Sequence, residues 1–224
     1  MSNPTPSLYL FDMDHTLIDN DCDVSWKEFL IAKGLASPAA RLTAAHFFEQ
    51  YNRGELKIDE FMAFQLAEFR GRTPAEMAQL AREHFHSFVR HTIYEEGRRL
   101  VADLLAAHIP VALLTSTNEV VAHPAAKALG ITDILATPLE IRNGKYTGKL
   151  GGAYCGGEGK IGAASQYCSI HGCTLAEAAY YGDSVADIPL LSVIGFPRPT
   201  NPSAALKTHA LAHGWPVISF TEPA

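Results

Sequence analysis

Two carboxylates, two residues apart, follow the first apolar run of the chain. Asp12 and Asp14 come directly after Leu8–Phe11, a segment typical of a buried parallel strand. Because an extended backbone repeats every two residues, both acids face one side at the carboxyl edge of a sheet, where α/β proteins bind ligands. Carboxylates this close raise each other's pKa unless a cation lies beside them. The pair therefore points to a divalent metal ion, although a helix N-cap or a solvated turn gives the same pattern.

Three later segments place polar side chains at the ends of further predicted elements. An apolar strand at residues 111–116 ends in the hydroxyls of Thr115 and Ser116. Lys160 follows a glycine-rich stretch at the expected start of a helix. A third strand, at residues 178–181, leads into Gly182, Asp183, Ser184 and Asp187. Each segment also has an ordinary interpretation, since a lone lysine is usually solvated and a serine with an acid three residues later often starts a helix.

Together these segments resemble the four-motif signature of the haloacid dehalogenase superfamily in its phosphatase form. In chain order, the matching motifs are Asp12-x-Asp14-x-Thr16, Thr115, Lys160 and Gly182-Asp183-Ser184-x-x-Asp187. A helical insert after the first motif, and residues 143–148, which resemble a hairpin, indicate subfamily IB, the branch that contains phosphoserine phosphatase. The resemblance implies an α/β fold: a Rossmann-like parallel sheet core of this superfamily's type with an inserted α-helical bundle as a cap.

The resemblance also implies a role for each acid. Asp12 would be the nucleophile that forms an aspartyl-phosphate, because a carboxylate is already ionised at neutral pH. Asp14 would act as the acid/base, and its backbone carbonyl would be a metal ligand. The cofactor would be Mg²⁺, which reduces the repulsion between nucleophile and phosphate. Its ligands would come from Asp12, Asp14, Asp183 and Asp187, the last acting through metal-bound water or by positioning Lys160.

The other motif residues would hold the phosphate or support the loops. Thr115, with Ser116 and its amide nearby, would hydrogen-bond a phosphate oxygen, and Lys160 would hold the phosphate against Asp12. Supporting roles would fall to Thr16, Gly182 and Ser184. Thr16 would brace its loop through bonds from its hydroxyl to the backbone, and Gly182 would let the backbone approach closely.

Hydrophobic periodicity predicts the elements that position these residues. The hydrophobic periodicity of residues 17–88 is helical throughout. It predicts a helical cap domain at 18–89 and a core domain formed by 1–17 and 90–224. A capping box at residues 73–76 starts the last helix of the cap. After it we expect a helix at 94–108 and strands at 111–114, 134–136, 178–181 and 194–196, with a last edge strand at 215–220. Gly130 ends the helix after the second strand, and Pro124 is expected to kink or split it.

The cap would select the substrate. Asp21 and Asp23 enter its inner surface and could bind an ammonium or imidazolium group, although solvated turn acids give the same pattern. Phosphoserine-specific members of the branch carry a carboxylate-binding arginine on a cap helix, whereas residues 61–65 hold none. We therefore expect a small phosphomonoester of an amino alcohol, such as histidinol phosphate, with phosphoserine as the alternative.

Composition excludes several other classes of protein. The 224 residues carry a net charge of −6 without a basic stripe, which disfavours nucleic acid as a partner. No apolar run approaches the roughly 20 residues of a membrane span, and the first residues do not resemble a secretory signal, so we expect a cytoplasmic protein. The four cysteines are too scattered for a disulfide framework. The oligomeric state is not predicted.

Two other functions use similar residues. A phosphotransferase or mutase of the same superfamily would shield its aspartyl-phosphate from water. A receiver domain of a signalling protein also carries clustered acids, a threonine and a lysine on a parallel sheet, but it has roughly half this length and no large helical insert.

Overall fold

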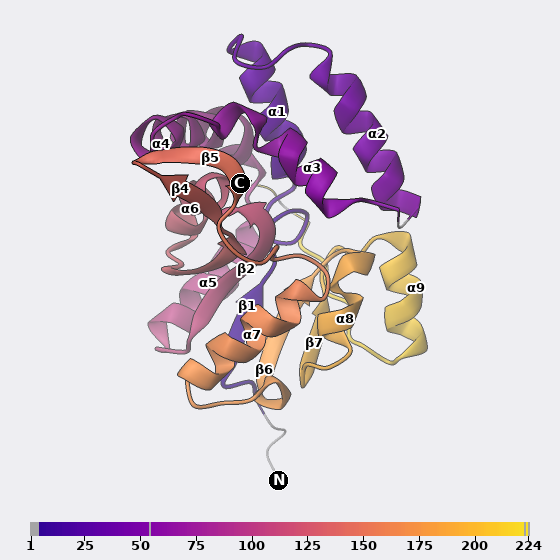
Figure 1. Cartoon of the computed structure of the whole chain (residues 1–224). Helices are drawn as coiled ribbons and strands as arrows, with labels where there is room; N and C mark the ends of the chain where they lie inside the picture. The colour runs from indigo at the N-terminus through magenta and orange to yellow at the C-terminus, as the bar shows by residue number, and fades with distance from the viewer. Residues whose placement is uncertain (1–4, 54, 222, 224) are drawn as a thin grey trace.

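A parallel sheet of five strands forms the core of the computed structural model, which describes residues 5–53, 55–221 and 223 (Figure 1). The strand order is β3-β2-β1-β6-β7, and every neighbouring pair is parallel. The bounds are β1 Leu8–Phe11, β2 Val111–Asn118, β3 Asp133–Thr137, β6 Ala178–Gly182 and β7 Phe196–Pro199. This arrangement confirms the predicted α/β fold with a Rossmann-like sheet.

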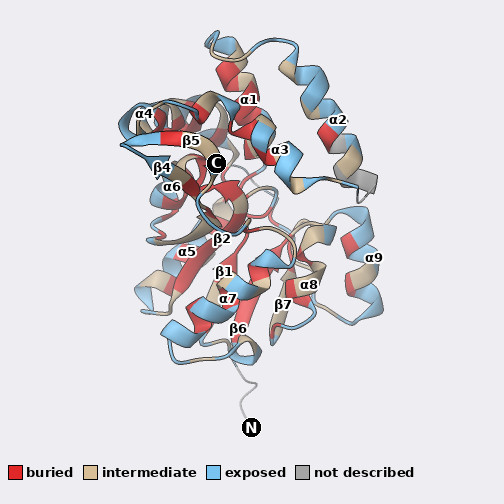
Figure 2. Cartoon of the chain, in the orientation of Figure 1, coloured by how far each residue is buried: buried red, intermediate tan, exposed pale blue. Residues whose placement is uncertain are grey.

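Helices cover both faces of the sheet, because alternate residues of each strand point to opposite sides. Phe11 and Leu113 pack in one cluster with residues of α5 (Glu95–Ala106) and α6 (Glu119–Leu129). On the other face, Leu8, Leu10 and Tyr180 pack against three more helices. These are α7 (Gly159–Ile170), α8 (Ile188–Leu191) and α9 (Ala204–Ala212). Figure 2 shows the central strands β1, β2 and β6 as largely buried, as expected for a doubly covered sheet, whereas the edge strands β3 and β7 are mostly of intermediate burial.

A helical insert follows β1 and lies at the top of Figure 1. Its helices are α1 (Cys22–Ala32), α2 (Ala40–Arg53), α3 (Ile58–Gln65) and α4 (Pro74–His84), followed by shorter turns to residue 92. The described part of residues 22–92 contains no strand, as the periodicity predicts. Thr73 and Glu76 form the expected capping box at the start of α4. The division into cap and core domains at residues 18 and 90 stays a prediction.

A two-stranded hairpin joins the core to the insert. It consists of β4 (Leu139–Arg142) and β5 (Lys145–Leu150), connected by Asn143 and Gly144, both with positive φ. Such a two-residue turn is typical of Asn-Gly sequences and confirms the predicted hairpin. The Tyr146 backbone donates to the Arg72 carbonyl and accepts from Gly71, both at 2.9 Å. The hairpin is therefore hydrogen-bonded to the insert.

Some element boundaries differ from the sequence-based ones. The last strand of the sheet begins at Phe196 rather than at 194, and it contains prolines, which an edge strand tolerates because one side needs no N–H donor. Among the described residues, 215–220 form only a single bridge, between Thr200 and Ile218, instead of a strand. Helix α6 runs through Pro124 without splitting, since a proline removes only one intrahelical hydrogen bond. No helix in the described part of the chain is long and apolar enough to cross a membrane.

Candidate active site

A cavity of about 430 Å³ opens where the carboxyl ends of the core strands face the insert. Its core wall contains Asp12, Asp14, Ser116 and Asp183, which lie far apart in sequence. Its cap wall contains Asp21, Asp23, Val24, Ala44, Phe47, Leu56, Phe61 and Gln65. Further lining comes from His15, Tyr154, Ser184, Val185, Ser203 and Ala205. Acids from two strand ends and the first cap helix thus share one space.

Asp12 lies one residue after β1 and is 7% exposed. Its amide donates to the Tyr181 carbonyl at 2.8 Å, which continues the ladder between β1 and β6 and fixes the backbone. Oδ1 accepts from the Met13 amide and Oδ2 from Lys160 Nζ, each at 2.8 Å. Burial raises the pKa of Asp12 to about 7, while Lys160 opposes the shift. A buried carboxylate is therefore held in a defined orientation beside a cation.

Lys160, the second residue of α7, is 2% exposed and reaches across to the strand ends. Its Nζ donates to Asp12, to Asp187 Oδ1 at 2.7 Å and to Tyr180 Oη at 2.8 Å. Although burial disfavours the charged amine, the two acids hold the pKa of Lys160 well above its usual value. Sequence reasoning missed Tyr180; a phenol among the apolar residues of a fully buried strand was the available signal.

Asp187 is fully buried and accepts five hydrogen bonds. Oδ1 accepts from Lys160 and from Tyr180 Oη at 2.5 Å, and Oδ2 accepts from the Asp183 amide and from the amide and hydroxyl of Ser184. A Cβ at Gly182 would meet Asp187 Cγ at 2.8 Å, so the close approach expected at this glycine is to Asp187. These contacts favour the positioning of Lys160 over direct metal ligation as the role of Asp187.

Asp14 is held by residues of both the core and the insert. Oδ1 accepts from the amide of Cys22, the first residue of α1, at 2.8 Å, and Oδ2 accepts from Thr117 Oγ1 at 2.7 Å. Burial and the neighbouring charge of Asp21 raise the pKa of Asp14 to about 6. A pKa near neutrality suits a group that both gives and takes a proton. Thr117, two residues after the predicted Thr115, was not identified from the sequence.

The acids around Lys160 fit a divalent cation. Asp12, Asp183 and Asp187 offer carboxylate oxygens that all lie within 4.8 Å of one another. Burial and the charges of Asp12 and Asp187 raise the pKa of Asp183 to about 9. One lysine cannot neutralise three carboxylates, and carboxylate oxygens are the ligands that Mg²⁺ prefers. Because the oxygens of Asp187 are already occupied, Asp12 and Asp183 are the residues that would hold the ion directly; the Asp14 side chain is outside this group.

The hydroxyl residues occupy unequal positions. Ser116 lines the cavity, whereas Thr115 is fully buried and its Oγ1 accepts from the Thr117 amide at 3.2 Å. Ser184 contacts Asp187, as described above. The prediction that the Thr16 hydroxyl bonds to the backbone is wrong, because its buried Oγ1 has no hydrogen-bond partner among the described residues. The tight turn instead uses the Thr16 amide, which donates to Met13 at 3.3 Å.

The cap side of the cavity carries two acids among mostly apolar residues. Asp21 caps α1 by accepting from the Val24 amide at 3.0 Å and still lines the cavity. Asp23 lies beside it, and burial together with the charges of Asp21 and Asp14 raises the pKa of Asp23 well above its usual value. Among the side chains that the structure describes, no arginine or lysine lines this cavity. The lining of the cavity therefore carries negative charge without a basic side chain to offset it.

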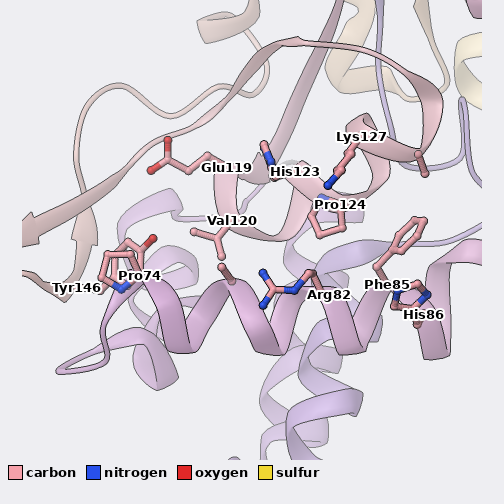
Figure 3. A pocket seen from close by; sticks show the side chains of 12 residues that line it. Pro74, Arg82, Phe85, His86, Glu119, Val120, His123, Pro124, Lys127 and Tyr146 are labelled. Atoms are coloured by element: carbon pink, nitrogen blue, oxygen red, sulfur yellow. The ribbon is translucent and has the colours of Figure 1, made fainter.

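A second hollow, of about 660 Å³, lies between α4 and α6 (Figure 3). Arg82 comes from α4, and His123 and Lys127 come from α6. Its lining contains one acid, Glu119, whose Oε1 accepts from the Leu139 amide at 3.1 Å. Without paired acids this hollow cannot supply the chemistry described above, so the candidate active site is the acidic cavity.

Similarity to known proteins identifies the family. The haloacid dehalogenase-like hydrolase profile matches residues 9–192, which include all the motif residues. The chain belongs to this family. Histidinol-phosphatase of Neisseria meningitidis serogroup C (strain 8013) is 36% identical over 220 residues, 96% of this chain and 99% of that protein. Phosphoserine phosphatase SerB1 of Mycobacterium tuberculosis (strain ATCC 25618 / H37Rv) is 34% identical over 214 residues, 94% of this chain and 70% of that protein.

A solved structure shares the fold of this chain. The crystal structure of a protein with unknown function from Bordetella pertussis Tohama I has a TM-score of 0.88 and 36% identity, and the match covers 97% of this chain and 100% of that one. The protein is thus a haloacid dehalogenase-like phosphatase of the branch related to phosphoserine phosphatase, as the motifs predicted.

Proposed function

We propose that this phosphatase hydrolyses a small phosphomonoester through an aspartyl-phosphate on Asp12. The observation that carries the proposal is the buried contact between Asp12 and Lys160 beside Asp183. In the first step, a carboxylate oxygen of Asp12 attacks phosphorus in line with the leaving oxygen, and Asp14 donates a proton to that oxygen. In the second step, Asp14 takes a proton from the water that hydrolyses the aspartyl-phosphate.

The other residues hold the reacting groups in place. Lys160, held by Asp187 and Tyr180, supplies a positive charge at Asp12 and the phosphate, and Ser116 lies where its hydroxyl can contact a phosphate oxygen. We also propose that the hydroxyl of Thr115 donates a hydrogen bond to a phosphate oxygen. When bound by Asp12, Asp183 and the Asp14 carbonyl, Mg²⁺ would offset the charge of phosphate and nucleophile and orient the attack.

For the substrate, we propose histidinol phosphate. One relative that matches this chain along nearly its whole length bears the name histidinol-phosphatase. The acidic wall at Asp21 and Asp23 supports the same choice, because histidinol phosphate carries an ammonium and an imidazole but no carboxylate. Phosphoserine is the second candidate, on the similarity to SerB1. We also propose, as the sequence predicts, that the enzyme is cytoplasmic.

The test is release of inorganic phosphate with Mg²⁺ from histidinol phosphate, phosphoserine and a chromogenic aryl phosphate. We expect the highest kcat/KM for histidinol phosphate and no turnover by Asp12→Asn, whose fold is checked by circular dichroism. If Asp12→Asn keeps most of the activity, the assignment of Asp12 as the nucleophile is refuted. Transfer of the phosphoryl group to an added acceptor alcohol, without release of inorganic phosphate, would indicate a phosphotransferase. A stable phospho-adduct without turnover would indicate a receiver-like protein.

A further inference from the structure

Gln65 presents a buried amide oxygen without a hydrogen-bond donor. It is the last residue of α3, lines the acidic cavity and is only 5% exposed. Its Oε1 has no partner among the described residues. Native proteins pair most buried acceptors, because a buried oxygen that has lost its water is destabilising. An unpaired acceptor in the wall of a substrate cavity therefore indicates a donor on the substrate.

The orientation of this amide is fixed by its other end. Gln65 Nε2 donates to the Asp23 carbonyl at 3.4 Å. Rotating the amide by half a turn would place two oxygens against each other. Oε1 is therefore the end of Gln65 that remains for a ligand.

The charge next to Gln65 selects the kind of donor. The Asp23 carboxylate also lines the cavity and is half-buried, and the charge of Lys27 offsets it only in part. Burial and the nearby Asp21 and Asp14 raise the pKa of Asp23, so a cation would stabilise its charged form. A positively charged nitrogen meets both needs, since it donates hydrogen bonds and neutralises the acid.

We propose that Gln65 is a specificity-determining residue whose Oε1 accepts a hydrogen bond from a protonated amine or imidazole of the substrate, next to the charge of Asp23. The inference rests on the proposed function, because it assumes that the phosphate of the same molecule lies at Asp12. A substrate carboxylate at this position would face an acceptor oxygen and an acid. Gln65 and Asp23 therefore disfavour phosphoserine, although it too carries an ammonium group.

The experiment compares histidinol phosphate with p-nitrophenyl phosphate, which lacks a cationic nitrogen. Gln65→Met keeps the length of the side chain but removes the acceptor, so the ratio of the two kcat/KM values should fall about tenfold or more, mainly through KM for histidinol phosphate. Gln65→Asn keeps the amide but withdraws the acceptor from the cavity by one methylene, so it should also lower the ratio. Gln79→Met, an exposed change on α4, is the matched control and should leave both kcat/KM values unchanged.

The outcomes separate this inference from the proposed function. If the wild-type enzyme hydrolyses p-nitrophenyl phosphate but not histidinol phosphate, the proposed substrate is wrong. If it hydrolyses both and Gln65→Met keeps the wild-type ratio within twofold, the substrate stands and the role of Gln65 is refuted. Should Gln65→Met lose its melting transition, Gln65→Asn decides: a ratio that stays within twofold of the wild-type value contradicts the acceptor role.

Discussion

His84 is a histidine that the insert holds without charge. It ends α4, has no exposed surface, and its ring lies 5.4 Å from that of Trp26 and 5.7 Å from that of Phe29. Its only polar contact in the described structure is Nε2 to Ser25 Oγ at 2.8 Å. Burial lowers the pKa of His84 to about 4. We predict that His84 contributes a destabilising term to the folded protein in mild acid.

The size of the effect follows from linkage. A histidine has a pKa of about 6.5 in an unfolded chain, and the fall to about 4 corresponds to about 3 kcal/mol of free energy of unfolding. Because the folded pKa is the lower one, the unfolded chain binds more protons between these two values. The stabilising term is complete above about pH 6.5 and is lost as the pH falls toward 4. At pH 4.5 the loss should reach about 2.5 kcal/mol.

Urea unfolding of the wild type and of His84→Leu, between pH 7.5 and pH 4.5, measures this loss. Groups that titrate in both proteins contribute equally to the two free energies of unfolding, so they cancel in the difference between them. Between pH 7.5 and pH 4.5 this difference should shift by about 2.5 kcal/mol in favour of His84→Leu. The exposed His86 provides the control, since His86→Leu should keep the wild-type pH dependence. A difference that stays constant to about 0.5 kcal/mol would refute the reasoning.

Three further results are expected. Lys160→Ala leaves Asp12 without its cation and should lower kcat by about 10³-fold or more in a phosphate-release assay; a twofold loss would remove Lys160 from the site. Gly182→Ala forces Asp187 to move and should cost about 1–3 kcal/mol in urea unfolding, so wild-type stability would contradict the close contact. Removing metal with EDTA should abolish turnover. Adding Mg²⁺ at 100 times its Kd should stabilise the wild type by about 2.7 kcal/mol and should stabilise Asp183→Asn by much less. Equal stabilisation of the two proteins would exclude Asp183 as a ligand.

Local patterns in the sequence predicted most of the fold. The strand at residues 8–11 was assigned with its observed bounds because it is a continuous apolar run followed by acids. The hairpin was predicted from the resemblance of residues 143–148 to the hairpin of subfamily IB, and Asn143 and Gly144 have the positive φ that its two-residue turn requires. The start of the last strand was misplaced by two residues. Its prolines argue against a strand in the sequence and are tolerated only because the strand lies at an edge.

The residues of the site likewise fall into those that the sequence predicts and those that it does not. The acids and Lys160 stand in recognisable motifs, whereas Thr117, Tyr180 and Gln65 acquire their roles only from neighbours distant in sequence. Thr117 contacts an acid 103 residues away, and no local pattern encodes that pairing. Tyr180 sits in an apolar strand, where a tyrosine is ordinarily read as packing.

Both carboxylate oxygens of Asp187 accept hydrogen bonds from several donors, and this limits which amino acids can replace it. Asparagine has nearly the same shape, but its amide carries two hydrogens in place of two lone pairs. In one rotamer these hydrogens would meet the ammonium of Lys160, and in the other they would meet the amides of residues 183 and 184. Both arrangements set donor against donor, so no isosteric residue can take position 187 without breaking contacts on one side of it.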